Sequence, residues 1–112
     1  MSREKKQELR EMSRMEALRV VREVLATYRA RKASGRITVD VRSGKAIWVK
    51  SVVADVKPPD SFPDEIEVLR GVDGALREFQ GRGASGTVTL VVCEGRGVEV
   101  EKVVELEKVR VG

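Results

Sequence analysis

The first 32 residues place their apolar side chains at the spacing of an α-helix. No glycine or proline interrupts this stretch, and Ser34-Gly35 supplies a stop signal after it. The pattern therefore predicts one helix over residues 2–32, with Met15 and Val24 on the flanks of its apolar stripe. The stripe itself is formed by Leu9, Met12, Leu18, Val21, Leu25 and Tyr28.

A helix of this length would be roughly 45 Å long, whereas a domain of this size is only about 25–30 Å across. Residues 1–15 should therefore form a helical extension beyond the domain body. Residues 3–14 are mostly charged, with Leu9 and Met12 as their main apolar side chains. Two outcomes stay open for this segment: an exposed helix whose narrow stripe is covered by a partner helix, or a disordered terminus.

Two runs of alternating apolar and polar residues follow and predict a β-hairpin. A two-residue Ser43-Gly44 turn would set Val39 opposite Trp48 and mix the two faces. A three-residue loop, residues 42–44, pairs Val39 with Ile47 instead and needs glycine in its third position. We therefore expect the three-residue loop, with Ile37, Val39, Val41, Ile47 and Val49 facing the core. The outer face of this hairpin would carry Arg36, Thr38, Asp40, Trp48 and Lys50.

The same order of patterns returns 51 residues later. Residues 16–57 and 67–108 align without a gap over 42 positions, of which 16 are identical. An internal period of this kind indicates two copies of one structural unit, here a helix followed by a hairpin.

In the second copy we expect a helix over residues 63–80, with Ser61 as its N-cap. Gly71 and Gly74 weaken this helix by roughly 1 kcal/mol each, so packing of its apolar stripe must hold it in place. The stripe is Leu69, Val72, Leu76 and Phe79.

The second hairpin should turn through a loop at residues 93–95, and one more short strand is expected over residues 106–111. The inward-facing residues of the second hairpin would be Val88, Leu90, Val92, Val98 and Val100.

Neither hairpin is stable alone, so the two should join in one sheet. The predicted fold class is α+β: a duplicated α-β-β unit forming an antiparallel sheet of four or more strands. Two helices would cover one face, related by a pseudo-two-fold, with the N-terminal helix extended. The expected organisation is one compact domain made of a helical extension (1–15), a first repeat (16–57), a proline-containing linker and helix start (58–66) and a second repeat (67–112).

Residues 86–92 read Gly-Thr-Val-Thr-Leu-Val-Val, the turn reads Glu94-Gly95-Arg96, and residues 107–111 read Glu-Lys-Val-Arg-Val. These motifs resemble the YezD-like family of small bacterial proteins, which combine a helix, a Gly-x-Val-x-Ile strand, an Asp-Gly-Lys turn, a second strand and a terminal Glu-Lys-x-Arg. Gly97 departs from that pattern, which has a β-branched residue there, and the first copy lacks the terminal motif. The resemblance implies the fold and a dimer of single-copy chains, of which this chain would be a fused version. It implies no activity.

Charge differs between the two copies. Residues 1–57 hold 15 Lys/Arg and 7 Asp/Glu, whereas residues 58–112 hold 7 and 11, within a net charge of +4. Halves of opposite sign attract each other within a chain or between chains, although surface drift after a duplication explains the difference equally well. The high share of charged residues, 36%, and the lack of asparagine are typical of heat-adapted proteins.

The composition gives no indication of enzymatic chemistry. There is no histidine, the commonest general base and zinc ligand. The single cysteine, Cys93, adjoins Glu94 and is expected to be an inert thiol. No apolar run approaches the 18 residues of a membrane span, and no apolar segment follows the basic N-terminus as in a secretory signal. We expect a cytoplasmic, non-enzymatic protein without metal or cofactor.

Two hypotheses about function remain. The first is an assembly or adaptor protein, a homodimer or bound to a larger protein partner. Its contacts would be made by the long N-terminal helix and the outer sheet face, with Leu9, Met12, Met15 and Trp48 as the partner-binding residues.

The alternative is a small basic nucleic-acid-binding protein that uses Trp48 and the Arg/Lys cluster of the first repeat. A tryptophan on an open sheet face can stack on a base while nearby cations contact phosphates. The residues concerned are Arg29, Arg31, Lys32, Arg36, Lys45, Trp48 and Lys50. Cations at a helix C-terminus also have a structural explanation, since they stabilise the helix dipole.

Overall fold

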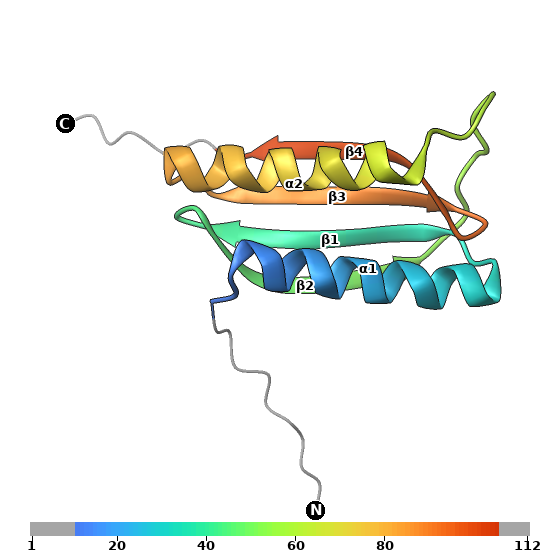
Figure 1. Cartoon of the computed structure of the whole chain (residues 1–112), viewed down its shortest axis with the longest axis horizontal. Coiled ribbons are helices and arrows are strands. Elements are labelled where there is room, and N and C mark those ends of the chain that lie inside the picture. The colour runs from blue at the N-terminus through green and yellow to red at the C-terminus, as the bar shows by residue number, and fades with distance from the viewer. Residues whose placement is uncertain (1–10, 106–112) are drawn as a thin grey trace, which may run out of the picture.

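A computed structural model of the chain describes residues 11–105. Figure 1 shows two helices lying on one face of a four-stranded antiparallel sheet with the strand order β2-β1-β3-β4. The elements are α1 (Arg14–Arg31), β1 (Gly35–Arg42), β2 (Lys45–Val53), α2 (Glu65–Arg82), β3 (Gly86–Cys93) and β4 (Arg96–Val104). The α+β prediction is therefore confirmed, with two helices and four strands.

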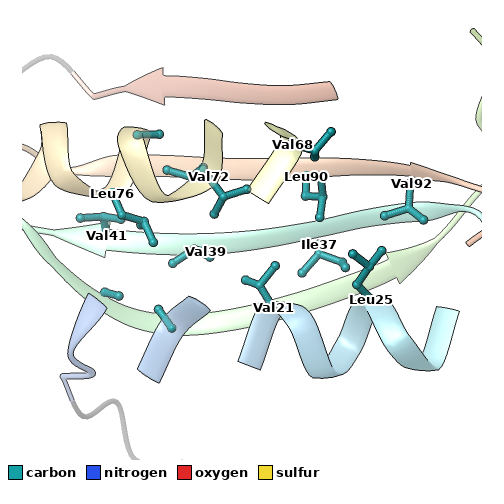
Figure 2. Close-up of a cluster of buried hydrophobic side chains, with 14 of the residues drawn as sticks. Val21, Leu25, Ile37, Val39, Val41, Val68, Val72, Leu76, Leu90 and Val92 are labelled. Atoms are coloured by element: carbon teal, nitrogen blue, oxygen red, sulfur yellow. The ribbon is translucent and has the colours of Figure 1, made fainter. Parts of the chain in front are cut away.

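The core lies between the helices and the sheet. Alternate residues of the two central strands point into it, and Ile37, Val39, Val88 and Leu90 are each only 1% exposed. Helix α1 contributes Val21 and Leu25, and α2 contributes Val72, Leu76 and Phe79, as Figure 2 illustrates for most of this cluster. The apolar stripes and the alternation predicted from the sequence therefore identify most of the core, although Ile47, expected to face it, is only half-buried and lies outside the core cluster.

Helix α1 is shorter than predicted. Ser13 is its N-cap and forms a capping box with Glu16, so the helix begins at Arg14. Just before the cap, the Met12 backbone N–H donates to the Ala46 carbonyl at 2.8 Å. The prediction of an extended helix is wrong for residues 11–13, because the chain there pairs with β2. Residues 2–10, including Leu9, lie outside the described residues.

Helix α2 also begins later than expected. Its N-cap is Asp64, whose side chain accepts from the Ile66 backbone N–H, and not Ser61. The helix continues to Arg82, and Gly83 closes it in the left-handed conformation. The predicted short strand over 106–111 lies outside the described residues.

The hairpin register differs from the prediction. Each hairpin turns through two residues, Ser43-Gly44 and Glu94-Gly95, all with positive φ as in a type I′ turn. Val39 pairs with Val49 and not with Ile47, because β2 has an extra residue between the partners of Val41 and Asp40. This bulge keeps the predicted outer residues Asp40 and Trp48 opposite each other, so the assignment of faces survives.

The second hairpin contains the same irregularity. Val92 pairs with Gly97 and Val91 with Glu99, so Val98 is the extra residue and has no direct partner, contrary to the expectation that it faces the core. Gly97 is buried, and a Cβ there would stand 3.0 Å from Val68 Cγ1. Close packing of α2 on β4 therefore explains glycine where a β-branched residue was expected.

The structural elements recur at the period of the sequence repeat. Every helix and strand of the second half starts and ends 51 residues after its counterpart. The Glu94 N–H donates to Ser34 Oγ and the Ser43 N–H to Ser85 Oγ, both at 2.9 Å, so the turn of each half is held by a loop of the other. Duplication of the unit and a pseudo-two-fold stay predictions.

Candidate partner interface on the outer sheet face

The sheet has a second face that the helices do not cover. We call it the outer face and define it by three cross-strand rows. In the order β2, β1, β3, β4, the first row is Trp48, Asp40, Thr87 and Val103, the central row is Lys50, Thr38, Thr89 and Glu101, and the third row is Val52, Arg36, Val91 and Glu99.

Apolar side chains on the outer face remain exposed at its two edges. Val52 is 59% exposed and Val103 is 61% exposed, whereas the core residues on the opposite face of the sheet are almost fully buried. Trp48 is half-buried. The segment after β2 contacts one end of this face, where the Val56 carbonyl lies 3.6 Å from Cys93 Sγ, and Val91 of the third row is only 4% exposed. Within residues 11–105, no helix lies over the three rows.

The middle of the outer face is polar and internally satisfied. Thr38 and Thr89 face each other on the two central strands, and their hydroxyl oxygens are 3.0 Å apart. Thr89 is only 9% exposed. This hydroxyl pair fixes the centre of the sheet at the junction of the two halves of the chain.

Charges on the outer face are separated by sign, with the exception of Asp40 on β1. Arg36 and Lys50 lie on β1 and β2, and Glu99 and Glu101 lie on β4. Six salt bridges form within the described part of the chain, and none of them involves a residue of the outer face. These four side chains and Asp40 therefore have no ionic partner among the described residues.

The helical layer, by contrast, pairs several of its charges. Arg14 contacts Asp73 and Arg29 contacts Glu65, which links α1 to α2 at two places. Lys102 of β4 contacts Glu78 of α2. That hydrogen-bonded ammonium holds the pKa of the Glu78 carboxyl below its usual value.

The predicted nucleic-acid-binding residues fall into separate groups. Arg36, Trp48 and Lys50 share the outer face. Arg29 and Arg31 are in the last turn of α1, and Lys32 is its C-cap. Lys45, at the start of β2, pairs with Glu11 at 3.6 Å. The structure therefore brings together three of these seven side chains on one surface.

The predicted partner-binding residues are likewise divided. Met15 is 66% exposed on α1, in the helical layer, whereas Trp48 is on the outer face. Met12 is half-buried and packs against the core. Sequence reasoning missed Val52 and Val103, although continuing the alternation past Lys50 and Glu101 would have found both.

Two small grooves lie at the ends of the helical layer. One, of about 300 Å³, lies between the segment before α1 and the hairpin turn that joins β1 to β2, and Glu11, Arg14 and Lys45 line it. The other, of about 330 Å³, is lined by Arg29, Glu65 and Arg96 among others. Most of these charges are paired, and Arg96 stacks over the Phe62 ring at 4.4 Å. Neither groove therefore collects unpaired catalytic groups.

Other chemistry is limited in residues 11–105. Cys93 is a free, buried thiol, 1% exposed. No group of three or more Cys, Asp or Glu side chains in this range is arranged to hold a metal ion. Neither of the described helices combines the length and the apolar character needed to cross a bilayer.

The chain matches no protein-family model, and comparisons with curated proteins and with solved structures also found no match. The resemblance to the YezD-like family therefore stays a prediction, and the outer face must be interpreted from its own residues.

Proposed function

We propose that the protein is a non-enzymatic assembly or adaptor protein that binds another protein through the outer face. The observation that carries this proposal is the pair of exposed valines, Val52 and Val103, on a sheet face that also holds five charges without ionic partners among the described residues. An exposed apolar patch bordered by polar groups is typical of an interaction site, and Trp48 connects the two valines, because it shares β2 with Val52 and the first row with Val103.

The pattern across the face supports protein binding. Apolar groups occupy opposite corners, and the charged groups lie beside them. Burial of apolar side chains would contribute affinity, roughly 25 cal/mol per Å² removed from water. The charges would orient the partner, because electrostatic complementarity mainly sets specificity and association rate.

The experiment is photo-cross-linking in native cell extract. The photoreactive residue p-benzoylphenylalanine is placed at Val103 on the outer face and, as a matched control, at Ala26, which is exposed on α1. A protein adduct is expected from position 103 and not from position 26. Excess wild-type chain should suppress it, whereas the double variant Val52→Asp, Val103→Asp should not.

The proposal is wrong if position 103 gives no protein adduct beyond that of position 26. It is also wrong if the double variant, shown to be folded by circular dichroism, competes as well as the wild type. Either result would mean that the outer face has no protein ligand.

A second candidate function is single-stranded nucleic-acid binding on the β1–β2 half of this face. The observation in its favour is that Trp48 shares the outer face with Arg36 and Lys50. Base stacking on an aromatic side chain contributes about 1–3 kcal/mol. Asp40 opposite Trp48 and the glutamates of β4 would repel phosphates and restrict the platform to this half.

Fluorescence anisotropy with a labelled single strand tests this second candidate. Trp48→Ala should raise Kd about tenfold or more, while Met15→Ala, on the other layer, should leave it unchanged. Absence of binding by the wild type, or equal effects of the two substitutions, would rule the candidate out.

A further inference from the structure

We infer that the protein partner of the outer face is a second copy of this chain, stacked face to face about a two-fold axis that runs parallel to the strands. The inference rests on the proposed function, because it names the ligand of the same surface. It is carried by Lys50 and Glu101, the two charges at opposite ends of the central row.

The central row decides the direction of the axis. Lys50 stands at its β2 end and Glu101 at its β4 end. A two-fold parallel to the strands exchanges the two edges of the sheet, so Lys50 of each copy meets Glu101 of the other. A two-fold across the strands would instead set Lys50 against Lys50 and Glu101 against Glu101. That second arrangement would set Asp40 over the other copy's Arg36, but the like charges in contact at both ends of the central row disfavour it.

The first row agrees with the same axis, whereas the third row gives an ion pair only diagonally, because Val52 lies directly over the other copy's Glu99. In the third row, Arg36 would lie beside the other copy's Glu99, since β1 and β2 are neighbouring strands about 4.8 Å apart. In the first row, Trp48 would lie over the other copy's Val103. Each dimer would therefore contain two Lys50–Glu101 contacts, two Arg36–Glu99 contacts and two Trp48–Val103 contacts.

The geometry of sheets permits this packing. Two stacked sheets lie about 10 Å apart and cross at about 30° when their strands are aligned. That separation leaves room for one layer of side chains from each copy. The threonines of the central row are already hydrogen-bonded to each other, so covering them leaves each hydroxyl with one partner.

The small size of the face favours a weak dimer. Four strands about 4.8 Å apart and three rows about 6.7 Å apart give roughly 400 Å² per copy, or about 800 Å² in the dimer. Interfaces of this size belong to weak and transient complexes. Self-association should therefore depend on concentration, and it should weaken as salt screens the ion pairs.

Charge reversal tests the arrangement by sedimentation equilibrium on the purified chain. Lys50→Glu places two Glu–Glu contacts in a homodimer, and Glu101→Lys places two Lys–Lys contacts. Each should raise the dimer Kd about tenfold or more. An equimolar mixture of the two variants should regain wild-type affinity, because both contacts in the mixed dimer are Glu–Lys.

Matched controls carry the same changes of charge on exposed residues of α1. Arg22→Glu and Glu23→Lys, both exposed in the helical layer, should leave Kd unchanged. Recovery in the mixture also demonstrates that both reversal variants are folded.

Three results would overturn the inference. The first is a wild-type chain that stays monomeric up to about 500 μM. The second is a pair of reversal variants that dimerise as well as the wild type, and the third is a mixture that fails to recover. A monomeric chain that still forms the cross-link from position 103 to a different protein would refute the second copy and leave the proposed function standing.

Discussion

The two faces of this sheet are formed by alternate residues of the same four strands, yet only the inner face is covered by helices. On the inner face, Val39 and Leu90 are each 1% exposed beneath the two helices. On the outer face, the threonines at the centre are satisfied, but Val52 and Val103 at the edges are more than half exposed. The difference indicates that the inner face serves folding, whereas the outer face retains surface that a partner can still bury.

Removal of a large core side chain should produce the largest contrast between the faces. Phe79→Ala on the inner side should lower the free energy of unfolding by about 3–5 kcal/mol, because it leaves a cavity under α2. Val52→Ala on the outer face should change it by less than about 0.5 kcal/mol. Urea denaturation measures both, and equal losses would contradict the division between a folding face and a binding face.

Overpacking of the inner face should have the second-largest effect on stability. Gly97→Val puts a side chain where a Cβ already stands 3.0 Å from Val68 Cγ1, so we expect a loss of about 1–3 kcal/mol in unfolding free energy. Val98→Ala, at the neighbouring bulge residue, is the control and should cost less. A stable Gly97→Val variant would show that α2 can shift away from β4.

The outer face has one polar element that matters for folding. Thr38→Val should lower the free energy of unfolding by about 1–2 kcal/mol, because it leaves the Thr89 hydroxyl, which is 9% exposed, without its partner. The double variant Thr38→Val, Thr89→Val should recover most of that loss, since both hydroxyls are then gone. Thermal unfolding of the single and double variants measures the coupling, and additive losses would contradict it.

The inner side also contains a polar defect. The Tyr28 hydroxyl is buried and has no hydrogen-bond partner among residues 11–105, whereas the residue at the same place in α2 is Phe79. Tyr28→Phe should therefore raise the free energy of unfolding, by up to about 1 kcal/mol. Chemical denaturation would detect this gain, and a loss would mean that the hydroxyl contributes an interaction with solvent or a ligand.

The smallest effect concerns pH. Contact with Lys102 lowers the pKa of Glu78 in the folded state, so the carboxylate stabilises the fold above its ordinary pKa of 4.5. This contribution is lost as the pH falls through the lowered value. Lys102→Ala should therefore flatten the loss of stability on acidification, measured by thermal unfolding between neutral and acid pH. An unchanged profile would show that the contact has no effect in solution.

Alternation and helical periodicity were sufficient to predict the architecture, because they determine which residues face the core. They predicted the outer-face positions of Arg36, Trp48 and Lys50 even though the register was wrong. The bulge restores the phase that a two-residue turn disturbs, so two registers give the same division into faces. Periodicity alone could not distinguish between them.

The helix starts were predictable from another signal. Ser13 and Glu16 form a capping box, and this pair was present in the sequence as Ser-x-x-Glu. The apolar stripe continued through it to Met12 and Leu9 and favoured a longer helix. The sequence alone could not show that Lys50 and Glu101 stand at opposite ends of one row. That placement depends on the strand order, because only the pairing of β1 with β3 relates the two edges of the sheet.

The reciprocal serine contacts hold the two halves of the chain together independently of the peptide that links them. Ser34 holds the turn at Glu94 and Ser85 holds the turn at Ser43, while β1 pairs with β3 along its length. Each half therefore completes the other without using the peptide that joins them. Cleavage of the exposed bond between Lys57 and Pro58 would leave two fragments that remain associated, and their separation would require the loss of the central strand pair.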